Sequence, residues 1–191
     1  MSDISSKIEL RRRLRAQRAA LAAALPDAAV RAADRLPLDR LPPHAVFAAY
    51  RPMGSEMDPG PLSRRLIAAG AQLALPVAEG REVPLVFRAW QLGGPLVPDA
   101  LGVPAPAPSA ASLHPDLVIT PLLAFDRLGG RLGQGGGHYD RTLAALRARG
   151  PVFVLGLAYA GQEVDLLALE AHDQRLDAIL TETGYRELTI S

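Results

Sequence analysis

Apolar residues follow two alternating patterns along the chain, one typical of helices and one typical of strands. Leu10, Leu14 and Leu21 fall on one stripe of a helical projection, which predicts an amphipathic helix at about 5–24. Further helices are predicted over 26–36, 61–69 and 138–149. Short apolar runs bounded by turn residues predict strands over 44–50, 72–76, 83–90, 117–120, 152–159 and 177–181.

The alternation of strands and helices predicts an α/β fold. We expect a single Rossmann-like domain over residues 1–191, in which helices flank a largely parallel or mixed central sheet. Residues 93–115 are rich in Pro, Ala and Gly and are expected to form an irregular but ordered excursion. Ligands of such sheets bind at the carboxyl ends of the strands, and Tyr50, Pro121 and Tyr159 each follow a predicted strand.

A glycine-rich run precedes the helix predicted at 138–149. Six of the nine residues from Gly129 to Gly137 are glycine. Consecutive residues without side chains let backbone N–H groups face an anion together, and a helix N-terminus adds partial positive charge. The run is flanked by two guanidinium groups, a phenol and a carboxylate, from Arg131, Arg141, Tyr139 and Asp140. We predict a polyphosphate site here, with a flexible surface loop as the alternative.

Two common nucleotide motifs do not describe this run. The chain has no Gly-x-x-x-x-Gly-Lys-Ser/Thr, which excludes a P-loop. A Gly-x-Gly-x-x-Gly match is obtained only with misfit spacing, and no βαβ unit with a ribose-binding acid follows it. A dinucleotide site is therefore not expected.

The composition is that of a compact intracellular protein. The chain of 191 residues contains no cysteine, which excludes disulfides, a thiolate nucleophile and a zinc–thiolate site. We expect no secretory signal and no membrane span, because no apolar run approaches the roughly 20 residues that cross a bilayer. The net charge of +1 gives no reason to expect nucleic acid. The sequence thus favours a cytoplasmic enzyme.

Positive charge is concentrated in the first predicted helix. Residues 1–18 contain six Lys or Arg against Asp3 and Glu9. Lys7, Arg11 and Arg18 border its apolar stripe, from which such cations can reach an anionic ligand or extend over the edge of the core into water. A membrane surface and a transit peptide are further alternatives for a basic amphipathic helix. We interpret Arg18 as structural.

Several segments, in the same order along nearly the whole chain, resemble the 5-formyltetrahydrofolate cyclo-ligase family. The most specific are Phe125-Asp126, Gly130-Arg131-Leu132-Gly133 and Gly135-Gly136-Gly137-His138-Tyr139-Asp140-Arg141. The others are Lys7 with Leu10 and Arg11, Tyr50 to Glu56 with Asp58, Leu75-Pro76 with Phe87, Gly156 to Tyr159 with Gln162, His172-Asp173, and Asp177 to Glu182. The resemblance implies a monomer that converts 5-formyltetrahydrofolate and MgATP into 5,10-methenyltetrahydrofolate, ADP and phosphate.

The resemblance also implies site residues. Arg131 and Tyr139 would act on the transferred phosphoryl group, and Asp140 and Asp173 would bind Mg²⁺. The ATP-binding set would be Lys7, Arg11, Gly133, Gln134, Gly135, Gly136, Gly137, His138, Tyr139 and Asp140. The folate set would be Arg51, Met53, Glu56 and Phe125, with Glu56 pairing with pterin N–H groups. Structural roles remain open for each of them: a helix cap for Asp140, a helix start for Glu56, and core packing for Met53 and Phe125.

The chain departs from the pattern common in the family at two positions of the glycine run. Gly136 stands where a lysine is frequent, and His138 stands where a tyrosine is frequent. Two other functions stay open at this point. One is a cyclo-ligase-like paralogue that is non-catalytic or differently specialised, and the other is a sugar-phosphate-binding protein or isomerase, which an anion loop on a Rossmann-like sheet could also support.

Overall fold

The computed structural model describes the backbone of residues 2–188 and the side chains from Lys7 onward. The helices are α1 (Ser2–Ala24), α2 (Ala28–Asp34), α3 (Gly60–Ala68) and α4 (His138–Arg147), with short 3₁₀ turns η1 (Leu38–Arg40) and η2 (Ala160–Gln162). The strands are β1 (Val46–Ala48), β2 (Gln72–Val77), β3 (Val86–Ala89), β4 (Val97–Pro98), β5 (Pro104–Ala105), β6 (Leu117–Thr120), β7 (Ala124–Phe125), β8 (Arg131–Leu132), β9 (Phe153–Leu157), β10 (Ala178–Thr181) and β11 (Gly184–Glu187).

The central sheet has seven strands in the order β11-β10-β9-β6-β1-β2-β3. Neighbours from β10 to β2 pair in parallel, whereas β11 and β3 close the two edges as antiparallel strands. All residues of β6 and β10 are buried, as expected for strands whose two faces are both covered. The sheet is therefore mixed but mostly parallel, and the predicted α/β class is confirmed.

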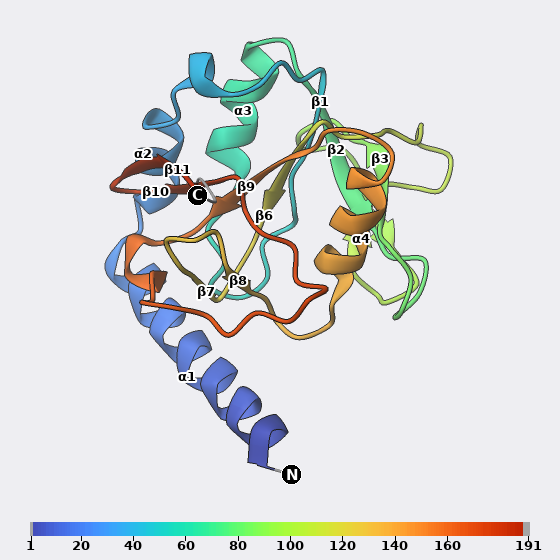
Figure 1. The fold of residues 1–191 in the computed structure, drawn as a ribbon. Coiled ribbons are helices and arrows are strands. Elements are labelled where there is room, and N and C mark those ends of the chain that lie inside the picture. The colour runs from blue at the N-terminus through green and yellow to red at the C-terminus, as the bar shows by residue number, and fades with distance from the viewer. Residues whose placement is uncertain (1, 189–191) are drawn as a thin grey trace.

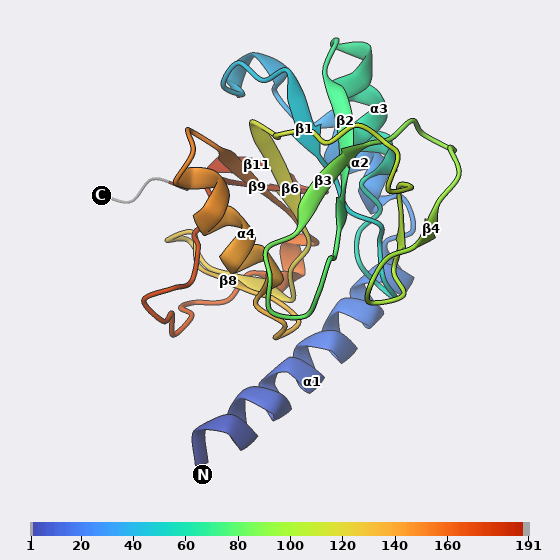
Figure 2. The same ribbon diagram turned by 90° about the vertical axis from the view of Figure 1, so that its right-hand side faces the viewer.

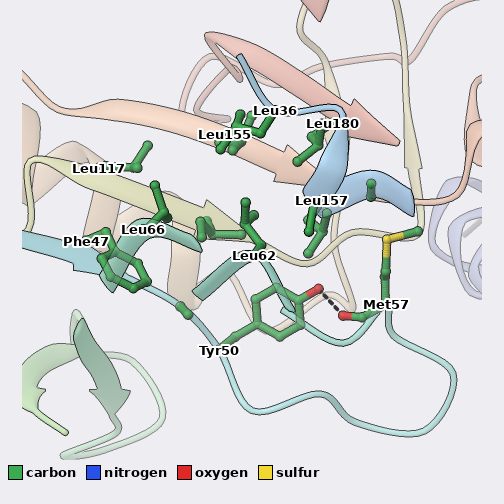
Figure 3. Close-up of a cluster of buried hydrophobic side chains, with 14 of the residues drawn as sticks. Leu36, Phe47, Tyr50, Met57, Leu62, Leu66, Leu117, Leu155, Leu157 and Leu180 are labelled. Atoms are coloured by element: carbon green, nitrogen blue, oxygen red, sulfur yellow. Dashed lines mark hydrogen bonds between the residues drawn. The ribbon is translucent and has the colours of Figure 1, made fainter. Parts of the chain in front are cut away.

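Helices cover both faces of the sheet. Figure 2 shows α4 on one face and α2 with α3 on the other. Leu143 and Leu146 of α4 belong to one buried cluster, and Leu62 and Leu66 of α3 belong to another. Figure 3 shows the second cluster, in which leucines from several strands pack against those of α3. Tyr50 lies at its border, and its hydroxyl donates to the carbonyl of Met57 at 2.5 Å.

Helix α1 runs along one side of this body, and its N-terminal end points away from the sheet (Figures 1 and 2). Its apolar stripe explains the contact, because Leu14 is buried against Leu123 and Ala124. Farther along the helix, Leu21 lies so close to Gly161 that a Cβ there would meet its side chain at 2.8 Å. The helix begins at Ser2, earlier than the predicted start at about 5.

The long elements follow the hydrophobic pattern, whereas several short ones do not. The 93–115 excursion is largely irregular, as predicted, but contains the small hairpin of β4 and β5. The strand β11 and the hairpin of β7 and β8 were not predicted. These strands have two to four residues, too few for a period to be recognised. The β7–β8 hairpin matters most, because it leads the chain into the glycine-rich run.

Candidate active site

A cavity of about 780 Å³ opens at the carboxyl ends of β1, β2 and β6. Tyr50, Pro76 and Pro121, which come just before or just after the ends of these strands, contribute to its lining. The remaining lining comes from α1, the glycine-rich run, the excursion after β4 and residues 167–173. This is the edge of the sheet at which a ligand is expected in an open parallel sheet.

One side of the cavity, the anion wall, consists of residues Arg131–Asp140 with Lys7 and Arg11 of α1. Helix α4 begins directly after Gly137, whose φ of 64° is left-handed and favours glycine. A Cβ on Gly137 would also meet Nη1 of Arg141 at 2.6 Å. The run thus delivers an open helix N-terminus to the cavity, where a negative ligand is favoured.

Arg131 and Asp140 form an ion pair within the anion wall. Nη2 of Arg131 donates to Oδ1 of Asp140 at 2.5 Å, and their side chains are 3% and 19% exposed. Nε of Arg131 is buried and has no hydrogen-bond partner among the described residues. A buried guanidinium donor without a partner carries an energetic cost that an anionic ligand could relieve. Arg131 therefore combines a fixed position with spare donor capacity.

Tyr139 and His138 follow the glycines at the start of α4, and both line the cavity. The guanidinium of Arg131 lies 5.8 Å from the centre of the Tyr139 ring, within cation–π range. Burial and then the charge of Glu56 raise the pKa of Tyr139, which Arg131 lowers in part. Its phenol therefore stays protonated at neutral pH. Nε2 of His138 is buried and unpartnered within the described part of the chain.

Helix α1 contacts the edge of the anion wall through cations. Nζ of Lys7 forms an ion pair with Glu170. Nε of Arg11 donates to the carbonyl of Gly133 at 3.3 Å, which holds the guanidinium beside the glycine-rich run. One helical turn farther on, Nε of Arg15 donates to the side-chain oxygen of Gln134 at 2.9 Å.

A second part of the lining, the Glu56 wall, consists of Tyr50, Arg51, Met53 and Glu56 after β1. The Glu56 side chain is only 5% exposed. Its Oε2 accepts from the backbone N–H of Met53 at 3.0 Å. Its Oε1 faces Nη1 of Arg18 at 3.4 Å and Nε2 of Gln134 at 3.5 Å. Burial, followed by the charge of Glu56, raises the pKa of the neighbouring Tyr50 well above its usual range.

Asp173 also borders the cavity, close to Asp140. The backbone N–H of Gln174 donates to Oδ1 of Asp140 at 3.1 Å, which places the residue after Asp173 directly at that carboxylate. Among the described residues, no group of three or more acidic or histidine side chains could hold a metal ion by itself. Two carboxylates that line one cavity do suit Mg²⁺, which usually takes one or two protein carboxylates and completes its shell with phosphate and water.

Comparison with known proteins agrees with this geometry. A sequence model of the 5-formyltetrahydrofolate cyclo-ligase family matches residues 3–182. The chain belongs to the 5-formyltetrahydrofolate cyclo-ligase family. It is 36% identical to the 5-formyltetrahydrofolate cyclo-ligase of Mycolicibacterium smegmatis over 70% of this chain and 71% of the relative. It is likewise 36% identical to that of Escherichia coli K12, over 72% of this chain and 76% of the relative.

A solved structure supports the family assignment. The NMR structure of Aquifex aeolicus 5,10-methenyltetrahydrofolate synthetase superimposes with a TM-score of 0.77 and 28% identity, covering 97% of this chain and 94% of that one. The predicted family, the α/β class and the assignment to a folate ligase of one-carbon metabolism are confirmed. No helix in the described part of the chain has the length and apolarity needed to cross a membrane.

The structure of this family member brings most of the predicted site residues to one cavity. These residues are Lys7, Arg11, Arg51, Met53, Glu56, Arg131, Gly133, Gln134, Gly135, Gly136, Gly137, His138, Tyr139, Asp140 and Asp173. The exception is Phe125, which is 1% exposed, packs in the core cluster that contains Leu143 and Leu146 of α4 and does not line the cavity. Its apolar side chain is used in the core instead. Tyr159 is likewise core rather than cavity lining.

Sequence reasoning missed one part of the site. The excursion after β4 contributes an apolar wall of Leu101, Val103 and Pro104. An irregular loop has no period that would reveal such a role. The contact of Arg15 with Gln134 was not predicted either; Arg15 lies outside the cavity lining, on the same face of α1 as Arg11.

Proposed function

We propose that the chain catalyses the ATP- and Mg²⁺-dependent conversion of 5-formyltetrahydrofolate to 5,10-methenyltetrahydrofolate, with release of ADP and phosphate. The observation that carries the proposal is that an anion wall and a buried carboxylate line one cavity in a member of the cyclo-ligase family. The anion wall suits a polyphosphate, and the carboxylate suits the N–H groups of a pterin.

The reaction requires activation of a poor leaving group. The formyl oxygen is held by amide resonance, so attack of the second folate nitrogen cannot expel it directly. Transfer of the γ-phosphoryl group to that oxygen breaks the bond to ADP and forms a phosphate ester. Ring closure by the nitrogen then breaks the carbon–oxygen bond and releases phosphate. Positioning of the two substrates and stabilisation of phosphate charge are the main demands on the protein.

The anion wall meets the second demand. We assign ATP binding to Lys7, Arg11, Gly133, Gln134, Gly135, Gly136, Gly137, His138, Tyr139 and Asp140. Arg131 would stabilise charge on the transferred group, with a donor free for it. Tyr139 would donate its phenolic proton in a hydrogen bond to the same group, because burial keeps that proton in place. Lys7 would exchange Glu170 for a phosphate oxygen when ATP is bound.

We assign Mg²⁺ to Asp140 and Asp173. The assignment is supported by the second oxygen of Asp140, since Oδ2 accepts no hydrogen bond from the described residues while Oδ1 is held by Arg131 and Gln174. When bound, the ion would neutralise phosphate oxygens. Asp140 would then hold the positive ion beside the phosphate chain, and Arg131 would bind the negative phosphate itself.

We assign folate recognition to Glu56, with Arg51 and Met53 beside it. Each oxygen of a carboxylate accepts about two hydrogen bonds. Oε2 has capacity for a further donor beside the N–H of Met53, whereas Oε1 already faces Arg18 and Gln134, so a bidentate pair with a pterin would replace the 3.5 Å contact of Gln134. One domain, a monomeric state and a cytoplasmic location stay predictions from the sequence.

An absorbance assay tests the proposal. Methenyl product should form from 5-formyltetrahydrofolate only when both ATP and Mg²⁺ are present, with one ADP released per product. Folding-competent protein that binds ATP but forms no product would contradict the activity. It would favour a specialised paralogue. Binding of sugar phosphates without folate would favour the isomerase alternative.

Two substitutions, one in each wall, test in the same assay whether the two walls bind different ligands. Asp140→Asn should remove most turnover and raise the Mg²⁺ concentration needed for what remains, because an amide oxygen is a weaker ligand. Glu56→Gln should weaken folate binding by about 1.5–3 kcal/mol, roughly ten- to a hundred-fold, because its amide N–H₂ would face pterin donors. ATP affinity should remain near that of the wild type in Glu56→Gln. Equal losses of both ligands would contradict this division of the cavity.

A further inference from the structure

Four cations on α1 form a stripe along one face of the helix. Lys7, Arg11, Arg15 and Arg18 are separated by four, four and three residues, the spacing that places side chains on one side. The stripe contacts three separate segments, because Lys7 pairs with Glu170, Arg11 and Arg15 contact the glycine-rich run, and Arg18 reaches Glu56. Arg12 lies off this face and pairs with Glu9 of the same helix.

Arg18 differs from the other three cations in its burial. It is 4% exposed and lies outside the cavity lining. Its guanidinium donates to Oγ of Ser55 at 3.2 Å and to the carbonyl of Leu122 at 3.2 Å, and it approaches Oε1 of Glu56 at 3.4 Å. A guanidinium presents its donors in a rigid planar fork, so these three acceptors fix its orientation.

Glu56 needs such a partner more than the other cavity acids do. Its side chain is 5% exposed, against 19% for Asp140 and 25% for Asp173. A carboxylate enclosed to this degree is costly in the charged form unless a cation compensates it. Arg18 is the cation that contacts Glu56 within the described residues. Arg18 lies outside the cavity lining, whereas Glu56 lines the cavity together with Gln134, whose Nε2 is 3.5 Å from the same Oε1.

We propose that Arg18 is the positioning residue for folate recognition: it holds the Glu56 carboxylate in place in the cavity lining without touching the substrate. The proposal rests on the assignment of Glu56 to folate given above. A purely structural role is the competing explanation, in which Arg18 fastens α1 to Ser55 and Leu122 and any loss is a loss of folding. The two explanations differ in what happens when Glu56 has already been changed.

A double-mutant cycle tests the proposal. Arg18→Met, Glu56→Gln and the double variant are titrated separately with 5-formyltetrahydrofolate and with ATP, after circular dichroism has established that each is folded. Arg18→Met should weaken folate binding about ten- to a hundred-fold and ATP binding less than about threefold. In the Glu56→Gln background, the same substitution should change folate affinity less than about threefold, because the group on which it acts is already lost.

Ser55→Ala provides a milder variant, since removal of one partner from a buried ion pair can prevent folding. It keeps both charges and loosens Arg18, so folate affinity should fall about two- to fivefold, and the loss should again vanish with Glu56→Gln. Arg12→Met is the matched control for a lost cation on α1 and should change neither affinity. Gln162→Leu is a control for buried contacts, because Gln162 donates to the same Leu122 carbonyl without reaching Glu56.

Each outcome bears on a single claim. Equal losses of folate affinity in the presence and absence of Glu56, or parallel losses of ATP affinity, would overturn the positioning role in favour of a structural one. The same losses in Gln162→Leu would do so as well. A Glu56→Gln variant with wild-type folate affinity would instead remove Glu56 from the folate site, and the proposed function would fail at that residue independently of Arg18.

Discussion

The two walls of the cavity each hold a carboxylate against an arginine, but under different constraints. On the anion wall, Arg131 and Asp140 lie 2.5 Å apart, and 19% of the Asp140 side chain is exposed. On the Glu56 wall, Arg18 and Glu56 lie 3.4 Å apart, and both side chains are 5% exposed. The first pair faces the cavity with both members, whereas the second presents only its carboxylate.

This difference matches the ligand proposed for each wall. A phosphoryl group changes its charge and its bonding during transfer, so the residues around it must exchange partners. The partly exposed carboxylate of Asp140, of which only Oδ1 accepts hydrogen bonds from the described residues, allows that exchange. A pterin ring keeps its pattern of N–H donors throughout the reaction, and a carboxylate held by a buried arginine is better suited to it. We therefore expect the residues of the anion wall to change partners during the reaction and Glu56 to keep its position.

Arg131→Ala should produce the largest effect. Loss of a fixed cation at the transferred phosphoryl group is expected to lower kcat by about a hundred- to a thousand-fold, the usual range for one preorganised donor. Folate affinity measured by titration should change little. Arg127→Ala is the matched control, because Arg127 lies in the same loop, is 79% exposed and pairs with Glu163 outside the cavity. A folded Arg131→Ala variant with near-normal kcat would contradict the role of Arg131 at the transferred phosphoryl group.

Most of the anion wall could be predicted from the sequence because the residues that α1 does not contribute are contiguous. Gly133 to Asp140 form one uninterrupted segment, and glycine content, flanking charge and a following helix can be recognised together. The Arg18–Glu56 pair joins residues 38 apart, and no local pattern specifies that contact. Phe125 was assigned to the folate site because an apolar side chain has the same sequence signature in a core and in a ligand wall.

The fold, like the site, has parts that the sequence predicts and parts that it does not. Buried strands such as β6 appear in the sequence as a continuous apolar run, and amphipathic helices such as α4 show a helical period over the whole element. The edge strand β11 and the excursion wall at Leu101 and Val103 depend on pairing with distant segments. These elements depend on contacts between segments far apart in the sequence, and the local spacing of apolar residues does not predict them.

Gly137→Ala should have the next largest effect. A side chain at φ 64° costs about 1–2 kcal/mol, and its Cβ would press on Arg141 at the entry to α4. We expect ATP affinity to fall about ten- to thirtyfold, because the helix N-terminus and the glycine-rich run shift together. Gly150→Ala is the matched control, since nothing lies within 4 Å of its Cβ position. If both substitutions behave alike, the anion wall is not held by this turn.

Arg11→Met should have a smaller effect, confined to the same wall. The Arg11 guanidinium is partly exposed and contacts the carbonyl of Gly133, so its removal takes away one screened cation and one loop contact. ATP affinity should fall about five- to tenfold, and high salt should narrow the gap to wild type. Arg13→Met removes a charge from an exposed position of the same helix and should leave ATP affinity unchanged. A loss of folate affinity in Arg11→Met would contradict the separation of the walls.

The smallest effect concerns Tyr139, which is influenced by both walls. Burial and the charge of Glu56 raise its pKa, and Arg131 of the anion wall lowers it in part. Burial also raises the pKa values of Tyr50, Tyr159 and Tyr185, so each of the four tyrosines of the chain binds its proton more tightly when folded. The folded state then holds more protons than the unfolded state above the ordinary tyrosine pKa of about 10, and its stability must fall as pH rises beyond that value.

Between about pH 6 and pH 9 the tyrosines stay protonated, so their ionisation should change neither turnover nor the free energy of unfolding with pH. Above about pH 10, tyrosinate absorbance should appear together with the loss of circular dichroism, because ionisation of the buried phenols requires unfolding. Tyr139→Phe removes one of these phenols, so its free energy of unfolding should decrease less steeply with pH there. An alkaline decline of wild-type turnover below about pH 9 that is missing in Tyr139→Phe would show that this phenol ionises in the folded enzyme, and the balance proposed between Glu56 and Arg131 would be wrong.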